Sequence, residues 1–129
     1  MHGNLMSTLD QPLQRCRVLV VEDEYFIACD LCRAVRAAGG EVAGPVARCA
    51  DGMRLLEEEG VDGAIVDVHL GIDGLAYPLV DELLRASVPV VFATGIPGAD
   101  IDPRYADIPI WVKPFLSDMV VSGLYGLCR

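Results

Sequence analysis

The chain has 129 residues and a formal net charge of −9, and 53% of its residues are hydrophobic. A chain of this length and hydrophobic content forms a single domain with a buried core, which excludes a disordered linker. The acidic charge argues against nucleic-acid binding, because phosphate contacts need a basic surface. The apolar runs are too short to cross a bilayer, and residues 1–17 lack the apolar segment of a signal peptide. We therefore expect a cytoplasmic protein that binds neither nucleic acid nor membrane.

The chain predicts an alternation of short apolar strands and amphipathic helices. The expected strands are residues 18–21, 41–43, 63–68, 88–93 and 108–112. The expected helices are residues 24–38 and 50–59, a helix with Pro78 in its first turn, and residues 116–127. The main strands show no polar alternation, as expected when both faces of a sheet are covered. Repeated strand–helix units predict the α/β class, with a parallel sheet and helices on both faces.

One connection interrupts this pattern. The stretch TGIPGADIDPRYAD, between the fourth and fifth strands, contains Pro97, Gly98 and Pro103. These residues leave room for a single helical turn at most, so the fourth helix, which would join these two strands, is expected to be short or missing. Residues 1–16 are expected to be a loose N-terminal extension, and residues 17–129 a single domain.

The five cysteines do not indicate a disulfide framework, because their number is odd and no secretory signal precedes them. Cys29 and Cys32 form a C-x-x-C pair, but they fall inside a helical pattern and not at a helix start, where the dipole would lower a thiol pKa. We interpret them as thiols on or near a helix surface.

Polar side chains follow the strands at their carboxyl ends. They are Glu22, Asp23, Asp67, Thr94 and Lys113. Because ligands bind beyond the carboxyl ends of parallel strands, these groups are expected to converge. Carboxylates are ligands of Mg²⁺, and such an ion would offset a mutual repulsion of about 4 kcal/mol per close pair. An aspartate beside a metal, an ammonium and a hydroxyl can act as a nucleophile in phosphoryl transfer.

The segments VLVVEDE, AIVDVHL, VVFATG and WVKPF resemble, in order and spacing, the motifs of the receiver domain of two-component response regulators. The resemblance covers residues 17–129 and implies a doubly wound, five-stranded parallel sheet of flavodoxin-like order 2-1-3-4-5. It implies that Asp67 is the phosphoacceptor, that Asp23 and Asp67 bind Mg²⁺ directly, and that Glu22 acts on the ion through water. The backbone carbonyl of His69 would complete the metal site.

The same resemblance implies that Thr94 bonds the phosphoryl group, that Lys113 pairs with it, and that Pro114 follows a cis peptide bond. The Phe-Ala-Thr-Gly sequence that ends at Gly95 resembles a subgroup of receivers with a degenerate fourth helix. The chain departs from the usual pattern at Ile110, where receivers carry an aromatic switch residue. The neighbouring Trp111 is expected on the opposite face of the strand.

These observations predict a non-enzymatic phosphoacceptor module, phosphorylated on Asp67 by a histidine kinase or a histidine phosphotransfer protein. It would act through contacts with a downstream protein, or through phosphate relay, and a homodimer remains open. The alternative is a small Mg²⁺-dependent phosphatase with an aspartyl nucleophile, although Asp67-Val68-His69 lacks the second acid that such enzymes typically carry. A third possibility, an unphosphorylated pseudo-receiver, is disfavoured by the intact set of acids.

Overall fold

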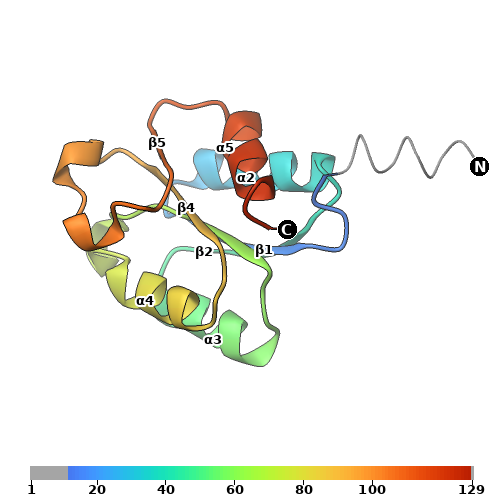
Figure 1. Ribbon diagram of the computed structural model, residues 1–129, viewed down its shortest axis with the longest axis horizontal. Helices are drawn as coiled ribbons and strands as arrows, with labels where there is room; N and C mark the ends of the chain where they lie inside the picture. Colours follow the sequence, from blue (N-terminus) through green and yellow to red (C-terminus); the bar gives the residue numbers. More distant parts are fainter. Residues whose placement is uncertain (1–11, 129) are drawn as a thin grey trace, which may run out of the picture.

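The computed structural model describes residues 12–128, in which five parallel strands form one sheet in the order β2-β1-β3-β4-β5 (Figure 1). The strands are β1 (Arg17–Val21), β2 (Glu41–Val46), β3 (Gly63–Val66), β4 (Val90–Thr94) and β5 (Ile110–Val112). The expected fold class and strand order are therefore confirmed.

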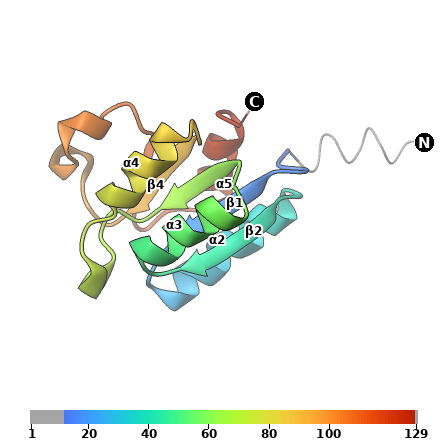
Figure 2. The same cartoon turned by 90° about the horizontal axis from the view of Figure 1, so that it is seen from below.

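Helices cover both faces of the sheet (Figures 1 and 2). The helices α2 (Tyr25–Ala37) and α5 (Ser117–Tyr125) pack together on one face, and α3 (Cys49–Glu58) and α4 (Tyr77–Arg85) pack together on the other. Successive residues of β1 alternate between the two core layers, with Leu19 in the layer under α3 and α4 and Val20 in the layer under α2 and α5. Because both layers are apolar, the strand needs no polar alternation. No helix of the described residues is both long and apolar enough to span a membrane.

Strand β2 is longer than its sequence indicates. It continues through Gly44 and Pro45 to Val46, with a register irregularity against β1 and a cis peptide bond between Gly44 and Pro45. A proline is tolerated here because β2 is an edge strand. Gly44 has a φ of +99° and lies against the carbonyl of Val20, which a Cβ would approach to 3.1 Å. The extension is relevant to the site, because the carbonyl of Val46 accepts a hydrogen bond from Glu22 N at 2.9 Å.

The connection between β4 and β5 contains no α-helix, which confirms the expectation that the helix between these two strands is short or missing. It contains two three-residue 3₁₀ turns, η2 (Gly98–Asp100) and η3 (Pro103–Tyr105), so the expectation of a single turn at most is wrong. The prolines stop an α-helix, but 3₁₀ turns use bonds between residues three apart and fit the short stretches that remain.

Tyr105 attaches this connection to α4. Its side chain is 2% exposed, its ring stacks on Tyr77 with centroids 4.5 Å apart, and its edge meets Phe92. Its hydroxyl donates a hydrogen bond to Asp81 Oδ1 at 2.6 Å. Burial, and then this hydrogen bond, raise the pKa of Tyr105 to about 12. Neither the helical periodicity nor the turn residues of the sequence indicated this anchor.

The predicted N-terminal extension lies mostly outside the described residues, which exclude residues 1–11 and Arg129. Its described part is not loose. Leu13 is fully buried, and its backbone N–H donates a hydrogen bond to Ala38 O at 2.8 Å. The packed domain thus begins several residues before the start of β1.

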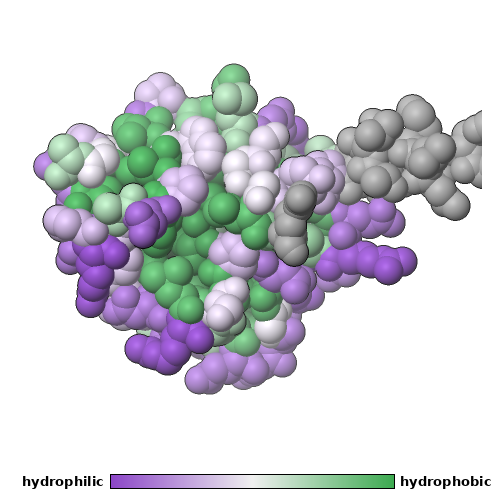
Figure 3. All heavy atoms as spheres, in the orientation of Figure 1, coloured by the Kyte–Doolittle hydropathy of each residue, from purple (hydrophilic) through white to green (hydrophobic). Residues whose placement is uncertain are grey.

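On the face of the molecule shown in Figure 3, apolar residues gather at the centre, and hydrophilic residues surround them. Figure 1 shows β4 at this centre in the same orientation. The adjoining edge strand β5 is incompletely covered, since Ile110 and Trp111 are half-buried and Val112 is exposed.

Candidate functional site

Three of the predicted polar residues meet at the carboxyl end of the sheet. Glu22 follows β1, Asp67 follows β3, and Lys113 follows β5, so residues far apart in the chain converge. The Nζ of Lys113 lies 2.8 Å from Asp67 Oδ2 and 3.1 Å from Glu22 Oε1. The carboxylates of Glu22 and Asp67 are almost completely buried, and Lys113 is the group that compensates their charge.

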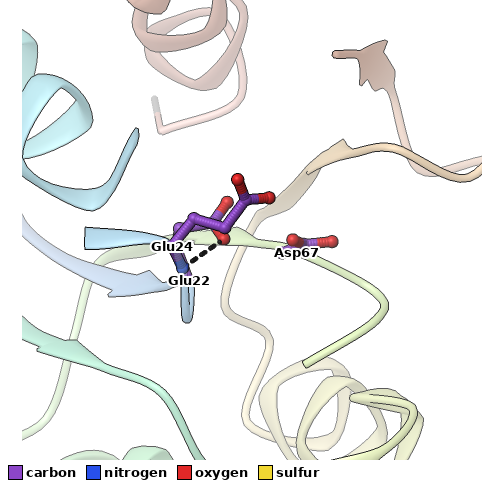
Figure 4. Close-up of side chains that lie close together, drawn as sticks. All are labelled: Glu22, Glu24 and Asp67. Carbon is purple, nitrogen blue, oxygen red and sulfur yellow. Dashed lines mark hydrogen bonds between the residues drawn. The ribbon is translucent and has the colours of Figure 1, made fainter. Parts of the chain in front are cut away.

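A third carboxylate, that of Glu24, joins this cluster. Its Oε1 lies 2.7 Å from Lys113 Nζ, and its backbone N–H donates to Glu22 Oε2 at 2.9 Å (Figure 4). The three carboxylates offer oxygens within 4.8 Å of one another. The sequence interpretation did not assign Glu24 to the site, although it is the third acid in the run after β1.

The electrostatics of the cluster follow from its burial. Burial, and then the negative charge of Asp67, raise the pKa of Glu22 to about 7, against the opposing effects of the Glu24 N–H and Lys113. Burial alone would lower the pKa of Lys113, but its hydrogen bonds to Asp67, Glu24 and Glu22 raise it overall. A single ammonium thus faces three carboxylates, and the cluster attracts further positive charge.

The donor set fits a hard divalent cation. Within the described chain, Glu22 Oε1 is a buried oxygen that accepts no hydrogen bond, although it lies 3.1 Å from Lys113 Nζ in an ion pair, and carboxylate oxygens are the preferred ligands of Mg²⁺. Asp23, predicted to be a direct ligand, is not one of the three carboxylates of this cluster. A Cβ at Gly71 would come within 2.7 Å of its Oδ2, and its side chain lines a separate pocket with Arg48. Its role as a metal ligand therefore stays a prediction.

Asp67 opens onto a pocket of about 280 Å³. The pocket is lined by Glu24, Asp67, His69, Gly95, Ile96 and Lys113. The backbone N–H of His69 donates to Asp67 Oδ1 at 3.2 Å, so each carboxylate oxygen of Asp67 has a donor. Thr94 is fully buried, and its Oγ accepts a hydrogen bond from Ile96 N at 3.3 Å. The next two residues after Thr94 form part of the pocket wall.

The residues around Lys113 hold it at the pocket. Its backbone N–H donates to Thr94 O at 2.8 Å, which continues the pairing of β5 with β4. The following peptide bond, Lys113–Pro114, is cis, as the family resemblance predicts.

Solved structures with the same fold point to one family. SdrG from Sphingomonas melonis Fr1 is 33% identical, with a TM-score of 0.76 over 88% of this chain and 97% of that one. The receiver (REC) domain of the response regulator PhyR from Erythrobacter litoralis has a TM-score of 0.79 and 24% identity, covering 89% of this chain and 91% of that one. The response regulator PhyR from Brucella abortus is 28% identical with a TM-score of 0.71. That match covers 98% of this chain but 53% of the other, so the chain spans about half of that protein.

The chain belongs to the response regulator receiver family. No family model and no curated protein sequence matches it. The position of Asp67, buried at the end of β3 beside a lysine that follows β5, is consistent with this family assignment.

This receiver domain lacks an aromatic side chain at the usual switch position. Ile110 packs into the core layer under α4, and Trp111 packs into the layer under α5, so the predicted alternation along β5 is confirmed. The indole ring of Trp111 lies directly on Gly123 of α5, where a Cβ would come within 1.9 Å of it. Trp111 is therefore held by α5 and is not oriented towards the Tyr105 side of the sheet.

Proposed function

We propose that this receiver domain is a phosphoacceptor signalling module, and that Asp67 accepts a phosphoryl group from a histidine kinase or a histidine phosphotransfer protein in the cytoplasm. The observation that carries the proposal is the contact of 2.8 Å between Lys113 Nζ and Asp67 Oδ2 at the wall of an open pocket. A partly buried lysine in this position supplies a fixed positive charge where a phosphoryl group would bring negative charge.

The proposed chemistry is a nucleophilic displacement at phosphorus. A carboxylate oxygen of Asp67 attacks the phosphorus of a phosphohistidine, and the new O–P bond forms as the P–N bond breaks. Lys113 would then pair with the phosphoryl oxygens, and the hydroxyl of Thr94 would leave Ile96 N to bond them. A Mg²⁺ ion held by Glu22, Asp23, Asp67 and the carbonyl of His69 would neutralise charge on the same oxygens.

A surface beside Lys113 suits the phosphodonor protein. A pocket of about 450 Å³ is lined by Glu24, Phe26, Ile27, Asp30, Lys113, Pro114, Phe115 and Ser117. The side chain of Phe26 in this lining is 84% exposed, and that of Leu116, between the lining residues Phe115 and Ser117, is 72% exposed. Exposed apolar side chains around a charged pocket are typical of protein-binding surfaces, and a partner docked there would bring its phosphohistidine to Asp67.

We propose that the output is a contact with a downstream protein or a further phosphate relay, and that the chain belongs to the Phe-Ala-Thr-Gly subgroup of receivers. PhyR from Bartonella quintana, of which this chain covers 51%, is described as an anti-anti-sigma factor, which supports an output through protein contacts. A homodimer is compatible with the exposed edge of β5. The alternative of a phosphatase has no support among the similar structures, whose named members are response regulators or their receiver domains.

The test is incubation with acetyl phosphate and Mg²⁺, followed by intact mass and peptide mapping. We expect a single phosphate adduct on Asp67, absent from the variant Asp67→Asn and retained by a matched control, Asp107→Asn, at an exposed position. An adduct that persists in Asp67→Asn would refute the assignment. Rapid turnover of a phosphomonoester without an adduct would favour the phosphatase.

A further inference from the structure

Two cysteines from opposite ends of the described chain meet at the amino end of the sheet. Cys16 lies directly before β1, and Cys128 follows α5. Both are partly buried and pack against the core layer under α2 and α5. Both also line a surface pocket of about 470 Å³, so small molecules in solution can reach them.

Contacts with Asp62 and Gly63 fix the position of the Cys128 thiol and of the backbone next to Cys16. The Cys128 thiol donates to Asp62 O at 3.5 Å, and it lies close enough to the Cys16 thiol for each to shift the pKa of the other. A Cβ at Gly63 would come within 2.9 Å of Cys128 Sγ, so the thiol occupies the space that the glycine leaves free. The backbone next to Cys16 is also held in place, because Arg17 N donates to Asp62 Oδ2 at 2.8 Å.

We propose that Cys16 and Cys128 form a redox modification site, at which a hydroperoxide joins them in a disulfide that links the two ends of the domain. The first thiolate attacks the peroxide oxygen to give a sulfenic acid and releases water or an alcohol. The second thiol then attacks the sulfenic sulfur, the S–S bond forms, and a molecule of water leaves. The two cysteines are oxidised by two electrons, and the peroxide is reduced by two.

The surroundings distinguish the roles of the two thiols. Burial, and then the charges of Cys16 and Asp62, raise the pKa of Cys128 to about 11. Burial and Asp62 also raise the pKa of Cys16, but the hydrogen bond that its sulfur accepts from Cys128 opposes them. Cys16 is therefore the thiol that attacks first, and Cys128 is the one that resolves the sulfenic acid. The raised pKa values make the reaction slow at neutral pH.

The cross-link would close a loop that contains almost the whole domain. Long loops lose the most conformational freedom in the unfolded chain when they are closed. We therefore expect the melting temperature of the oxidised protein to rise by an amount on the order of 10 °C.

The experiment uses the full chain and the triple variant Cys29→Ser/Cys32→Ser/Cys49→Ser, which keeps only the proposed pair. After treatment with hydrogen peroxide we expect the loss of two hydrogen atoms from the monomer mass, a Cys16–Cys128 peptide on non-reducing mapping, and a higher melting temperature, all reversed by a reductant. The variants Cys16→Ser and Cys128→Ser, folded as judged by circular dichroism, should show none of these changes. Overoxidation without a cross-link in the triple variant, or a wild-type cross-link between other cysteines, would overturn the proposal.

Discussion

The carboxyl edge of the sheet and the connection between β4 and β5 are stabilised in opposite ways. At the edge, Glu22 and Asp67 are buried with like charges, and one ammonium compensates both. In the connection no regular helix forms, yet Tyr105 fills the core and its single polar atom is satisfied by Asp81. The first region keeps an excess of negative charge, which suits cation binding and phosphoryl transfer. The second region has an irregular backbone but is firmly packed, because the buried ring of Tyr105 takes the place of a helix.

The largest effect is expected when that anchor is removed. Tyr105→Ala deletes a fully buried ring and leaves Asp81 without its donor, which should lower the free energy of unfolding by about 3–5 kcal/mol. Urea unfolding with and without Mg²⁺ measures the change. The loss should be the same in both conditions, because the anchor is separate from the charged edge. Tyr25→Ala, at a side chain that is 72% exposed, is the matched control and should cost little.

Mg²⁺ should stabilise the protein through the carboxyl edge of the sheet alone. A ligand that binds only the folded state adds about 2.7 kcal/mol at a concentration of about 100 times its Kd, so the melting temperature should rise with Mg²⁺. We expect Asp23→Ala to remove this response. The variant Glu24→Gln distinguishes the predicted ligand set, which includes Asp23, from the cluster of Glu22, Glu24 and Asp67. If Glu24→Gln lost the response and Asp23→Ala kept it, the ion would be held by Glu22, Glu24 and Asp67.

A smaller effect isolates the hydroxyl of Tyr105. Tyr105→Phe keeps the ring but removes the hydrogen bond to Asp81, which retains only its ion pair of 3.7 Å with Arg104, at a cost of about 1–2 kcal/mol at neutral pH. The folded pKa of about 12 lies above the ordinary value of 10.0, so the contribution of the tyrosine proton is complete below pH 10 and is lost as pH rises towards 12. The wild-type protein should therefore lose its advantage over Tyr105→Phe across this range, as followed by urea unfolding. A difference that stays constant up to pH 12 would contradict the raised pKa of Tyr105.

Much of the site could be predicted because strand ends are visible in a sequence. Asp67 and Lys113 each follow a short apolar run, and parallel strands bring their carboxyl ends to one edge. Glu24 was missed because its approach to Lys113 depends on the turn between β1 and α2, which local pattern does not specify. The orientation of Asp23 towards Gly71 depends in the same way on the loop after Asp67.

The sequence by itself determined the strand–helix alternation, the absence of an α-helix between β4 and β5 and the two faces of β5, because apolar periodicity and the backbone limits of proline are local properties. The tertiary structure alone decided which groups meet. Tyr105 finds Tyr77 and Asp81, and Cys16 finds Cys128, only when the helices have packed on the sheet. Such pairs carry no signal in local spacing, since the chain between their members is long and their contact depends on how the layers pack.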